Sequence, residues 1–138
     1  MSTTRAVIDR HVEAFNSRTV DDEPWGQDAE LVAPAGVFSG RDAVLGFLSV
    51  FQGAFSDGRL SITSAIVDGD NASVEGTFVG VHDGILQSPN GPVEATGRPV
   101  TFRWSATYRA HAGELLSEHL YFDQLDFLGQ LDLLPAHS

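Results

Sequence analysis

The hydrophobic pattern changes its period once along the chain, and this change limits the folds that the sequence can adopt. In the first half, apolar residues recur at helical spacing, as Ile8, Val12 and Phe15 do. From Leu60 onward, apolar and polar residues alternate, which is the period of a half-buried strand. Helices followed by a run of strands favour an α+β fold over a doubly wound α/β fold.

The helical half is predicted to contain two main helices. The first has about four turns and covers residues 4–18. The second begins near Arg41 and ends before Gly58, because the apolar residues between them form one stripe. Between the two helices, residues 21–24 suit the start of a short helix, and residues 32–40 are expected to be irregular.

The alternating half is predicted to form a meander of strands joined by turns. The expected strands are residues 60–67, 72–82, 98–109 and 114–122. A hairpin turn at 68–71 joins the first pair, and a helix over 124–134 follows the last strand. Gly76 and Gly80 lie within one strand, where they either bend it strongly or let a helix approach closely. Helices packed over a bent sheet leave an apolar pocket between the two layers.

The composition excludes several chemistries. The chain has no cysteine, which excludes a thiolate nucleophile, and no lysine, which excludes a Schiff base. Its net charge of −11 disfavours nucleic-acid binding, which needs a basic surface. Apolar runs are too short for a membrane span and the N-terminus has no signal-peptide segment, so we expect a cytoplasmic protein without membrane contact. The histidines lack ligand spacing, and phosphate-binding and dinucleotide motifs are absent, so we expect no metal and no cofactor.

Four segments of the chain resemble the SnoaL-like polyketide cyclases of the nuclear-transport-factor-2-like superfamily. The segments are residues 12–16, 78–84, 95–100 and 117–131. The resemblance is collinear over nearly the whole chain and implies a single domain over residues 1–138. It also implies an α+β cone, in which a strongly curved, mainly antiparallel sheet and N-terminal helices enclose an apolar pocket. The superfamily includes aldol cyclases, isomerases, dehydratases, epoxide hydrolases and binding proteins, so the fold does not select a reaction.

Asp123 is the main catalytic candidate. With a period of two, it shares one strand face with Ser117, His119 and Tyr121, and this polar row suits a pocket wall. The resemblance implies that Asp123 is the general acid/base of an intramolecular aldol closure. A carboxylate in an apolar pocket has a raised pKa and can accept a proton from a carbon beside carbonyl groups. The alternative is that Asp123 only caps the C-terminal helix.

Two further residues are catalytic candidates beside Asp123. His82 ends a strand, where it either polarises a substrate carbonyl or is a satisfied polar side chain. His119 either orients the Asp123 carboxylate or lines the pocket. The expected substrate-binding residues are Tyr121, which offers a hydroxyl to an oxyanion, and the aromatic residues Phe15, Trp25 and Phe78, with Trp25 placed in the region of the short second helix.

The chain departs from relatives of known chemistry in three places. Epoxide hydrolases of the superfamily use an Asp-Arg-Asp set, whereas Arg103 is followed two residues later by Ser105. The best-known aldol cyclases carry polar side chains at positions that match Ala33 to Ala35 and Ala106. Arg103 itself is expected on a solvated face, a dimer surface or a pocket rim.

The sequence therefore predicts a cofactor-free acid/base enzyme that acts on an apolar carbonyl compound, as an aldol cyclase or a proton-transfer isomerase. The alternatives are a non-catalytic small-molecule binding protein and an epoxide hydrolase or dehydratase of the same superfamily. Pairing through the outer face of the sheet predicts a homodimer. The expected partners are an apolar small molecule and a second copy of the chain.

Overall fold

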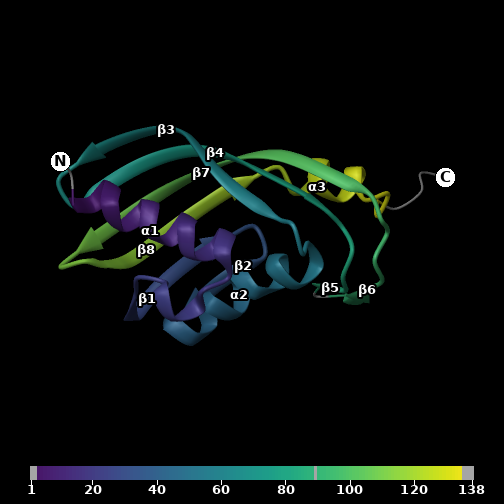
Figure 1. Cartoon of the computed structure of the whole chain (residues 1–138), viewed down its shortest axis with the longest axis horizontal. Coiled ribbons are helices and arrows are strands. Elements are labelled where there is room, and N and C mark those ends of the chain that lie inside the picture. Colours follow the sequence, from purple (N-terminus) through teal and green to yellow (C-terminus); the bar gives the residue numbers. More distant parts are fainter. Residues whose placement is uncertain (1–2, 89, 135–138) are drawn as a thin grey trace.

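The computed structural model describes residues 3–88 and 90–134, which form an α+β fold around one six-stranded mixed sheet (Figure 1). The helices are α1 (Thr3–Ser17), α2 (Arg41–Ala54) and α3 (Gln124–Gln130), with a 3₁₀ turn at Val20–Asp22. The strands of the sheet are β1 (Trp25–Ala33), β2 (Gly36–Ser39), β3 (Arg59–Asp68), β4 (Asn71–Val81), β7 (Pro99–His111) and β8 (Glu114–Phe122). A separate hairpin pairs β5 (Leu86–Ser88) with β6 (Gly91–Val93).

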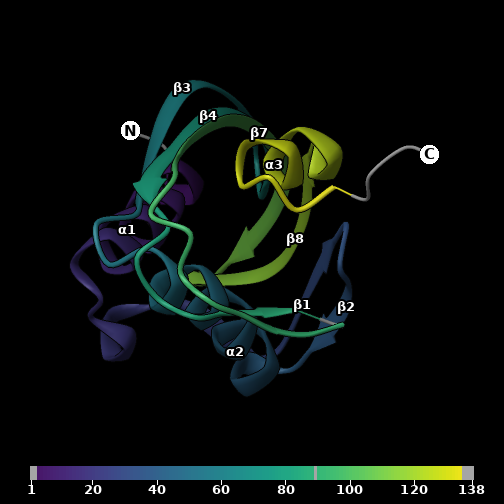
Figure 2. The ribbon, with the colours of Figure 1, turned by 90° about the vertical axis from the view of Figure 1, so that its right-hand side faces the viewer.

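The strand order in the sheet is β2-β1-β8-β7-β4-β3. All neighbouring strands are antiparallel except β1 and β8, which run parallel. The long strands curve around the interior, and helices α1 and α2 lie against the inner side of the sheet (Figure 2). This arrangement confirms the predicted α+β class with a curved, mainly antiparallel sheet. No helix in the described ranges combines the length and the apolar content that a membrane span needs.

Gly76 and Gly80 let neighbouring groups approach β4 closely. A Cβ atom at Gly76 would lie 2.4 Å from the ring of Trp104 and 2.4 Å from the carbonyl oxygen of Ser61. A Cβ atom at Gly80 would lie 3.1 Å from Gly58, just after α2 ends, and 3.2 Å from Phe55. The missing side chain of Gly80 therefore lets the segment that follows α2 pack closely against β4. The missing side chain of Gly76 lets the ring of Trp104 lie against the strand.

The region between the two main helices differs from the sequence prediction. Residues 32–40 are not irregular but form the end of β1 and all of β2, which pair as an antiparallel hairpin. The expected short helix at 21–24 is a single 3₁₀ turn, and Trp25 begins a strand instead of lying in a helix. Alternation in β1 is weak because acidic and amide side chains interrupt its apolar residues, so its strand character depends on pairing with β8. The C-terminal helix also ends earlier than expected, at Gln130.

Candidate functional site

The face of β8 that points to the interior is the opposite of the one that the sequence suggested. Glu118 is only 3% exposed, and Leu120 and Phe122 line a cavity beside it. His119 and Asp123 are exposed, and Tyr121 is 59% exposed, so the expected polar pocket wall is wrong. The reason is the pairing with β7, in which the buried row of Trp104, Ala106 and Tyr108 lies opposite Phe122, Leu120 and Glu118.

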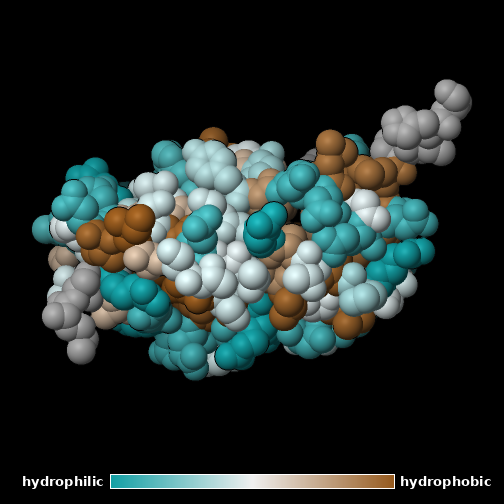
Figure 3. Space-filling view, turned by 90° about the horizontal axis from the view of Figure 1, so that it is seen from above, coloured by the Kyte–Doolittle hydropathy of each residue, from teal (hydrophilic) through white to brown (hydrophobic). Residues whose placement is uncertain are grey.

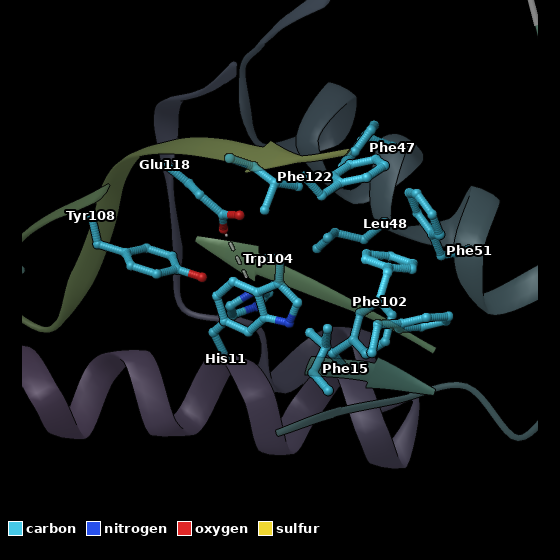
Figure 4. A pocket seen from close by; sticks show the side chains of 13 residues that line it. His11, Phe15, Phe47, Leu48, Phe51, Phe102, Trp104, Tyr108, Glu118 and Phe122 are labelled. Carbon is cyan, nitrogen blue, oxygen red and sulfur yellow. Dashed lines mark ion pairs between the residues drawn. The ribbon is translucent and has the colours of Figure 1, made fainter. Parts of the chain in front are cut away.

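The cavity is small and almost entirely apolar. Its free volume is about 40 Å³, which holds a few water molecules at most. Thirteen side chains from α1, α2, β3, β4, β7 and β8 meet there: His11, Phe15, Phe47, Leu48, Phe51, Leu60, Phe78, Phe102, Trp104, Tyr108, Glu118, Leu120 and Phe122. Figure 4 shows the polar groups gathered at one end and the phenylalanine rings at the other. We call this space the inner cavity.

A hydrogen-bonded cluster forms the polar end of the inner cavity. Nδ1 of His11 lies 2.6 Å from Oε1 of Glu23, and Nε1–H of Trp25 donates to the same oxygen at 3.2 Å. Nε2 of His11 lies 3.7 Å from Oε1 of Glu118, the ion pair drawn in Figure 4. The hydroxyl of Tyr108 hydrogen-bonds the Glu118 carboxyl group. Three buried acid or base side chains thus lie close together: His11 from α1, Glu118 from β8, and Glu23 from the segment before β1.

Burial and charge together shift the pKa values of this cluster. Burial raises the pKa of Glu118, and the charge of His11 and the hydrogen bond from Tyr108 partly offset that rise. Burial lowers the pKa of His11, but the charge and hydrogen bond of Glu23 together with the charge of Glu118 raise it above its ordinary value of 6.5. Burial and the two carboxyl groups raise the pKa of Tyr108 well above its ordinary value, which keeps its hydroxyl protonated as a donor.

Two buried polar atoms of the inner cavity have no hydrogen-bond partner among the described residues. They are Oε1 of Glu118 and Nε1 of Trp104. Buried polar atoms in proteins are almost always satisfied, so these two atoms are available to a water molecule or to a polar group of a ligand in the cavity. One atom accepts a hydrogen bond and the other donates one.

A second, larger space adjoins the inner cavity, and we call it the outer cavity. Its free volume is about 520 Å³, within the range of sites for drug-sized ligands. Residues of the turn before β2, β2, α2, β5, the end of β8 and α3 line it: Ala35, Phe38, Ala43, Gly46, Phe47, Val50, Phe51, Leu86, Gln87, Ser88, Phe122, Gln124, Phe127 and Leu128. Phe47, Phe51 and Phe122 line both cavities, so these rings separate the polar end from the larger apolar space.

Asp123 lies outside both cavities. Its exposed side chain accepts a hydrogen bond from the backbone N–H of Asp126 at 3.0 Å, which makes it the N-cap of α3. This capping is the alternative that the sequence left open. The catalytic role expected for Asp123 stays a prediction, and the geometry gives it no neighbour in the cluster around Glu118.

His82 is fully buried but occupies a different place from the other candidates. Nδ1 of His82 accepts the backbone N–H of Thr96 at 3.2 Å and lies 3.0 Å from the hydroxyl oxygen of the same residue. Burial lowers its pKa below the ordinary value. The ring packs against Phe55 with centroids 5.5 Å apart, and it lines neither cavity. His82 thus ties the loop after β6 to the end of β4, and it does not converge with His119 or Asp123.

Three of the predicted binding residues lie close to the inner cavity. Phe15 and Phe78 line it directly. Trp25 lies behind His11, with ring centroids 5.1 Å apart in an edge-on contact. Arg103 lies on the exposed face of β7, which was one of the three positions expected from the sequence. Its side chain therefore does not reach the interior.

Sequence reasoning missed His11, Glu23 and Glu118. His11 follows Ile8 by three positions and precedes Phe15 by four, which places it on the apolar face of α1. Glu118 shares the opposite face of β8 with the apolar residues Leu120 and Phe122. An ionisable residue within an otherwise apolar row is the pattern that identifies both His11 and Glu118. Glu23 lies in an irregular segment, where no such pattern exists.

The comparisons with known proteins agree with this architecture. The model of one protein family, described as the SnoaL-like domain, matches residues 8–119. Among solved structures, a proposed SnoaL-like polyketide cyclase from Jannaschia sp. CCS1 superposes with a TM-score of 0.82 at 16% identity, covering 96% of this chain and 94% of that one. IdmH from Streptomyces antibioticus, a proposed polyketide cyclase, gives 0.79 at 23% identity, with 94% and 98% covered.

A third similar structure is AclR from Streptomyces galilaeus, a proposed hydroxylase, with a TM-score of 0.80 at 19% identity, covering 96% of this chain and 87% of that one. Curated protein sequences give no match to this chain. Identities this low establish a shared fold and leave the reaction open. The family match covers most of the chain, and the fold agrees with it along nearly the whole length: the chain belongs to the SnoaL-like family.

Proposed function

We propose that this protein is a cofactor-free acid/base enzyme that acts on an apolar carbonyl compound, with Glu118 as the group that moves the proton. One observation carries the proposal. Oε1 of Glu118 is buried beside an apolar cavity and has no hydrogen-bond partner among the described residues. A carboxyl group in such a place is costly to the fold, and burial raises its pKa, which favours its use in accepting and returning a proton.

The chemistry uses only groups of this chain. An ionised Glu118 accepts a proton from the carbon beside the substrate carbonyl, and the resulting enolate oxygen is within the same polar end of the cavity. Nε1–H of Trp104, which has no partner among the described residues, supplies a donor there that stabilises a developing negative charge. Glu118 then returns the proton to carbon or to oxygen. Aldol ring closure and isomerisation share the first of these steps.

The outer cavity supports an apolar substrate body. The inner cavity has room for little more than a carbonyl group and its neighbouring carbon, whereas the outer cavity has about 520 Å³. A substrate that spans both places its polar end at Glu118 and its rings beyond Phe51. The side chain of Phe51 has to rotate for the two spaces to join.

Proton exchange at carbon tests the proposal without knowledge of the natural substrate. The test compound is 2-tetralone, an apolar bicyclic ketone, dissolved in D₂O, and NMR follows the loss of its α-proton signals. We expect the wild-type protein to accelerate exchange and E118Q to lose about 100-fold or more of that acceleration. The matched control is E114Q, which changes an exposed glutamate at the start of the same strand. Equal exchange by wild type and folded E118Q would refute the proposal.

A non-catalytic binding protein is the second candidate. The observation that favours it is that none of the described residues that line the outer cavity carries an acidic, basic or phenolic side chain. A ligand confined to that space would contact apolar side chains and the neutral polar side chains of Gln87, Ser88 and Gln124, and would undergo no reaction. In that case the protein would bind 2-tetralone, with changes in the NMR signals of Val50 and Phe127, and would not accelerate exchange.

A further inference from the structure

His11 lies between two buried carboxyl groups that approach opposite nitrogens of its ring. Nδ1 is 2.6 Å from Oε1 of Glu23, and Nε2 is 3.7 Å from Oε1 of Glu118. All three side chains are at most 4% exposed. The first distance is a short hydrogen bond, whereas the second is too long for one. Glu23 therefore determines the proton on Nδ1, and Nε2 faces the carboxyl group that the proposed function makes reactive.

We propose that Glu23 is a positioning residue that acts through His11 on Glu118, by keeping the imidazole charged and oriented beside the reactive carboxyl group. This inference rests on the proposed function for the role of Glu118 in proton transfer. It adds two residues to the site: His11, which lies beside Glu118, and Glu23, which acts only through His11. The network that they form runs from the segment before β1 through α1 to β8.

The position of Glu23 is fixed from several directions. Its Oε1 accepts hydrogen bonds from two donors, Nδ1–H of His11 and Nε1–H of Trp25. The guanidinium of Arg41, at the start of α2, donates to the backbone carbonyls of Glu23 and Trp25, each at 2.8 Å. With its side chain and backbone both held, Glu23 keeps the His11 ring in one orientation. Such a precise arrangement around a buried charge is typical of groups that support a reactive residue.

The charge of His11 matters because it decides whether Glu118 can ionise at all. A buried carboxyl group without a nearby cation remains protonated and cannot act as a base. The ionisable groups that face Glu118 are His11 from α1, Tyr108 from β7 and the more distant Glu23. Of these, only His11 favours the ionised carboxylate through its charge, and Tyr108 favours it through a hydrogen bond. A buried imidazole would in turn lose its proton without Glu23, since burial lowers its pKa and Glu23 contributes the largest opposing effect.

The experiment compares wild type with E23Q, whose amide oxygen still accepts from His11 and Trp25 but carries no charge. The matched control is E13Q, which changes an exposed glutamate on the same helix as His11. NMR of protein with ¹⁵N-labelled histidine reports the charge of His11, and ¹³C-labelled glutamate reports the titration of Glu118, assigned with E118Q. The pH profile of 2-tetralone exchange is recorded for the same proteins.

We expect His11 of wild type and E13Q to stay charged above the ordinary titration range of histidine, and His11 of E23Q to become neutral at lower pH. The titration of Glu118 and the acid side of the exchange profile should move to higher pH in E23Q by about 1 unit or more. Unchanged titrations of His11 and Glu118 in folded E23Q overturn the inference. If E23Q does not fold, the same titration of His11 is measured in E23D, which keeps the negative charge. A charged His11 in E23D supports the inference, and a neutral His11 overturns it. Because the titrations do not depend on turnover, they separate a failure of this inference from a failure of the proposed function.

Discussion

The Nδ1 atom of His11 lies 2.6 Å from Oε1 of Glu23, in a part of the core where both side chains are almost completely withdrawn from solvent. The two residues are twelve positions apart, on α1 and on the segment that enters β1. Their pair holds the imidazole against Glu118 of β8, so the site depends on the docking of α1 onto the sheet. A protein that needed only a stable core would be better served by apolar side chains at these three positions.

The first prediction concerns stability and pH. The folded state holds the proton of Glu118 more tightly than the unfolded state does, because its pKa is raised from the ordinary 4.5. Between that value and the raised one, the native protein binds more protons, so its free energy of unfolding falls as pH rises. His11, raised from 6.5, acts with the same sign and loses its contribution as pH rises through its folded value. E118Q should therefore become progressively more stable relative to wild type as pH rises above 4.5.

Urea unfolding at a series of pH values measures this difference. E114Q serves as the control, since its side chain is exposed and it should follow wild type throughout. A constant difference between wild type and E118Q across the range would contradict the account of Glu118 as a buried, proton-retaining carboxyl group.

The second prediction concerns the separation of the two cavities. Phe51 contacts the rings of Phe47, Phe78, Phe122 and Phe127 and lines both spaces. F51A should join the cavities and destabilise the protein by about 3 kcal/mol. It should also bind a tricyclic aryl ketone more tightly than wild type does, as measured by NMR titration.

The control for this test is V50A, which alters a residue that lines the outer cavity only. V50A should leave the preference between bicyclic and tricyclic ketones unchanged. If F51A and V50A change that preference equally, Phe51 does not separate the two spaces.

The third prediction concerns Gly76. A methyl group there would lie 2.4 Å from the ring of Trp104 and from the carbonyl oxygen of Ser61, and backbone cannot yield cheaply at that distance. G76A should destabilise the fold by about 2–3 kcal/mol and disturb the fluorescence of Trp104. G53A is the matched control on α2, where a Cβ atom meets nothing within 4 Å, and it should be neutral or stabilising. Equal thermal unfolding midpoints for the two variants would contradict the close packing of Trp104 on Gly76.

The fourth prediction is the homodimer. The outer face of the sheet is mostly polar or neutral, with separate apolar patches (Figure 3). Tyr121 is 59% exposed and pairs with Ser105 on that face. Light scattering should give about twice the chain mass of 14.8 kDa for wild type and for the control L125R, which changes an exposed residue of α3, and a single chain mass for Y121R. A monomeric wild type contradicts the prediction.

Much of the fold could be predicted from periodicity. The alternation over residues 98–109 predicted a strand there, and β7 forms at Pro99–His111, where its two neighbouring strands hold it to one register. Periodicity could not find β2, which is only four residues long.

The site was harder to predict for a physical reason. Alternation separates the two faces of β8 but does not say which one is inside, and the polar row ending at Asp123 was assigned to the pocket on the chemistry of its side chains. The interior face is set by pairing with β7, which is a long-range contact. Glu118, which lies on the opposite row of β8, was therefore missed.

The most direct test of the account compares α-proton exchange of 2-tetralone by wild type, E118Q, E114Q and D123N. Asparagine caps a helix as well as aspartate does, so D123N keeps the cap of α3 and removes only the acid. The account predicts that E118Q loses about 100-fold or more of the acceleration while E114Q and D123N retain it. Loss of exchange in D123N, with full exchange in folded E118Q, would contradict it and return the catalytic role to Asp123.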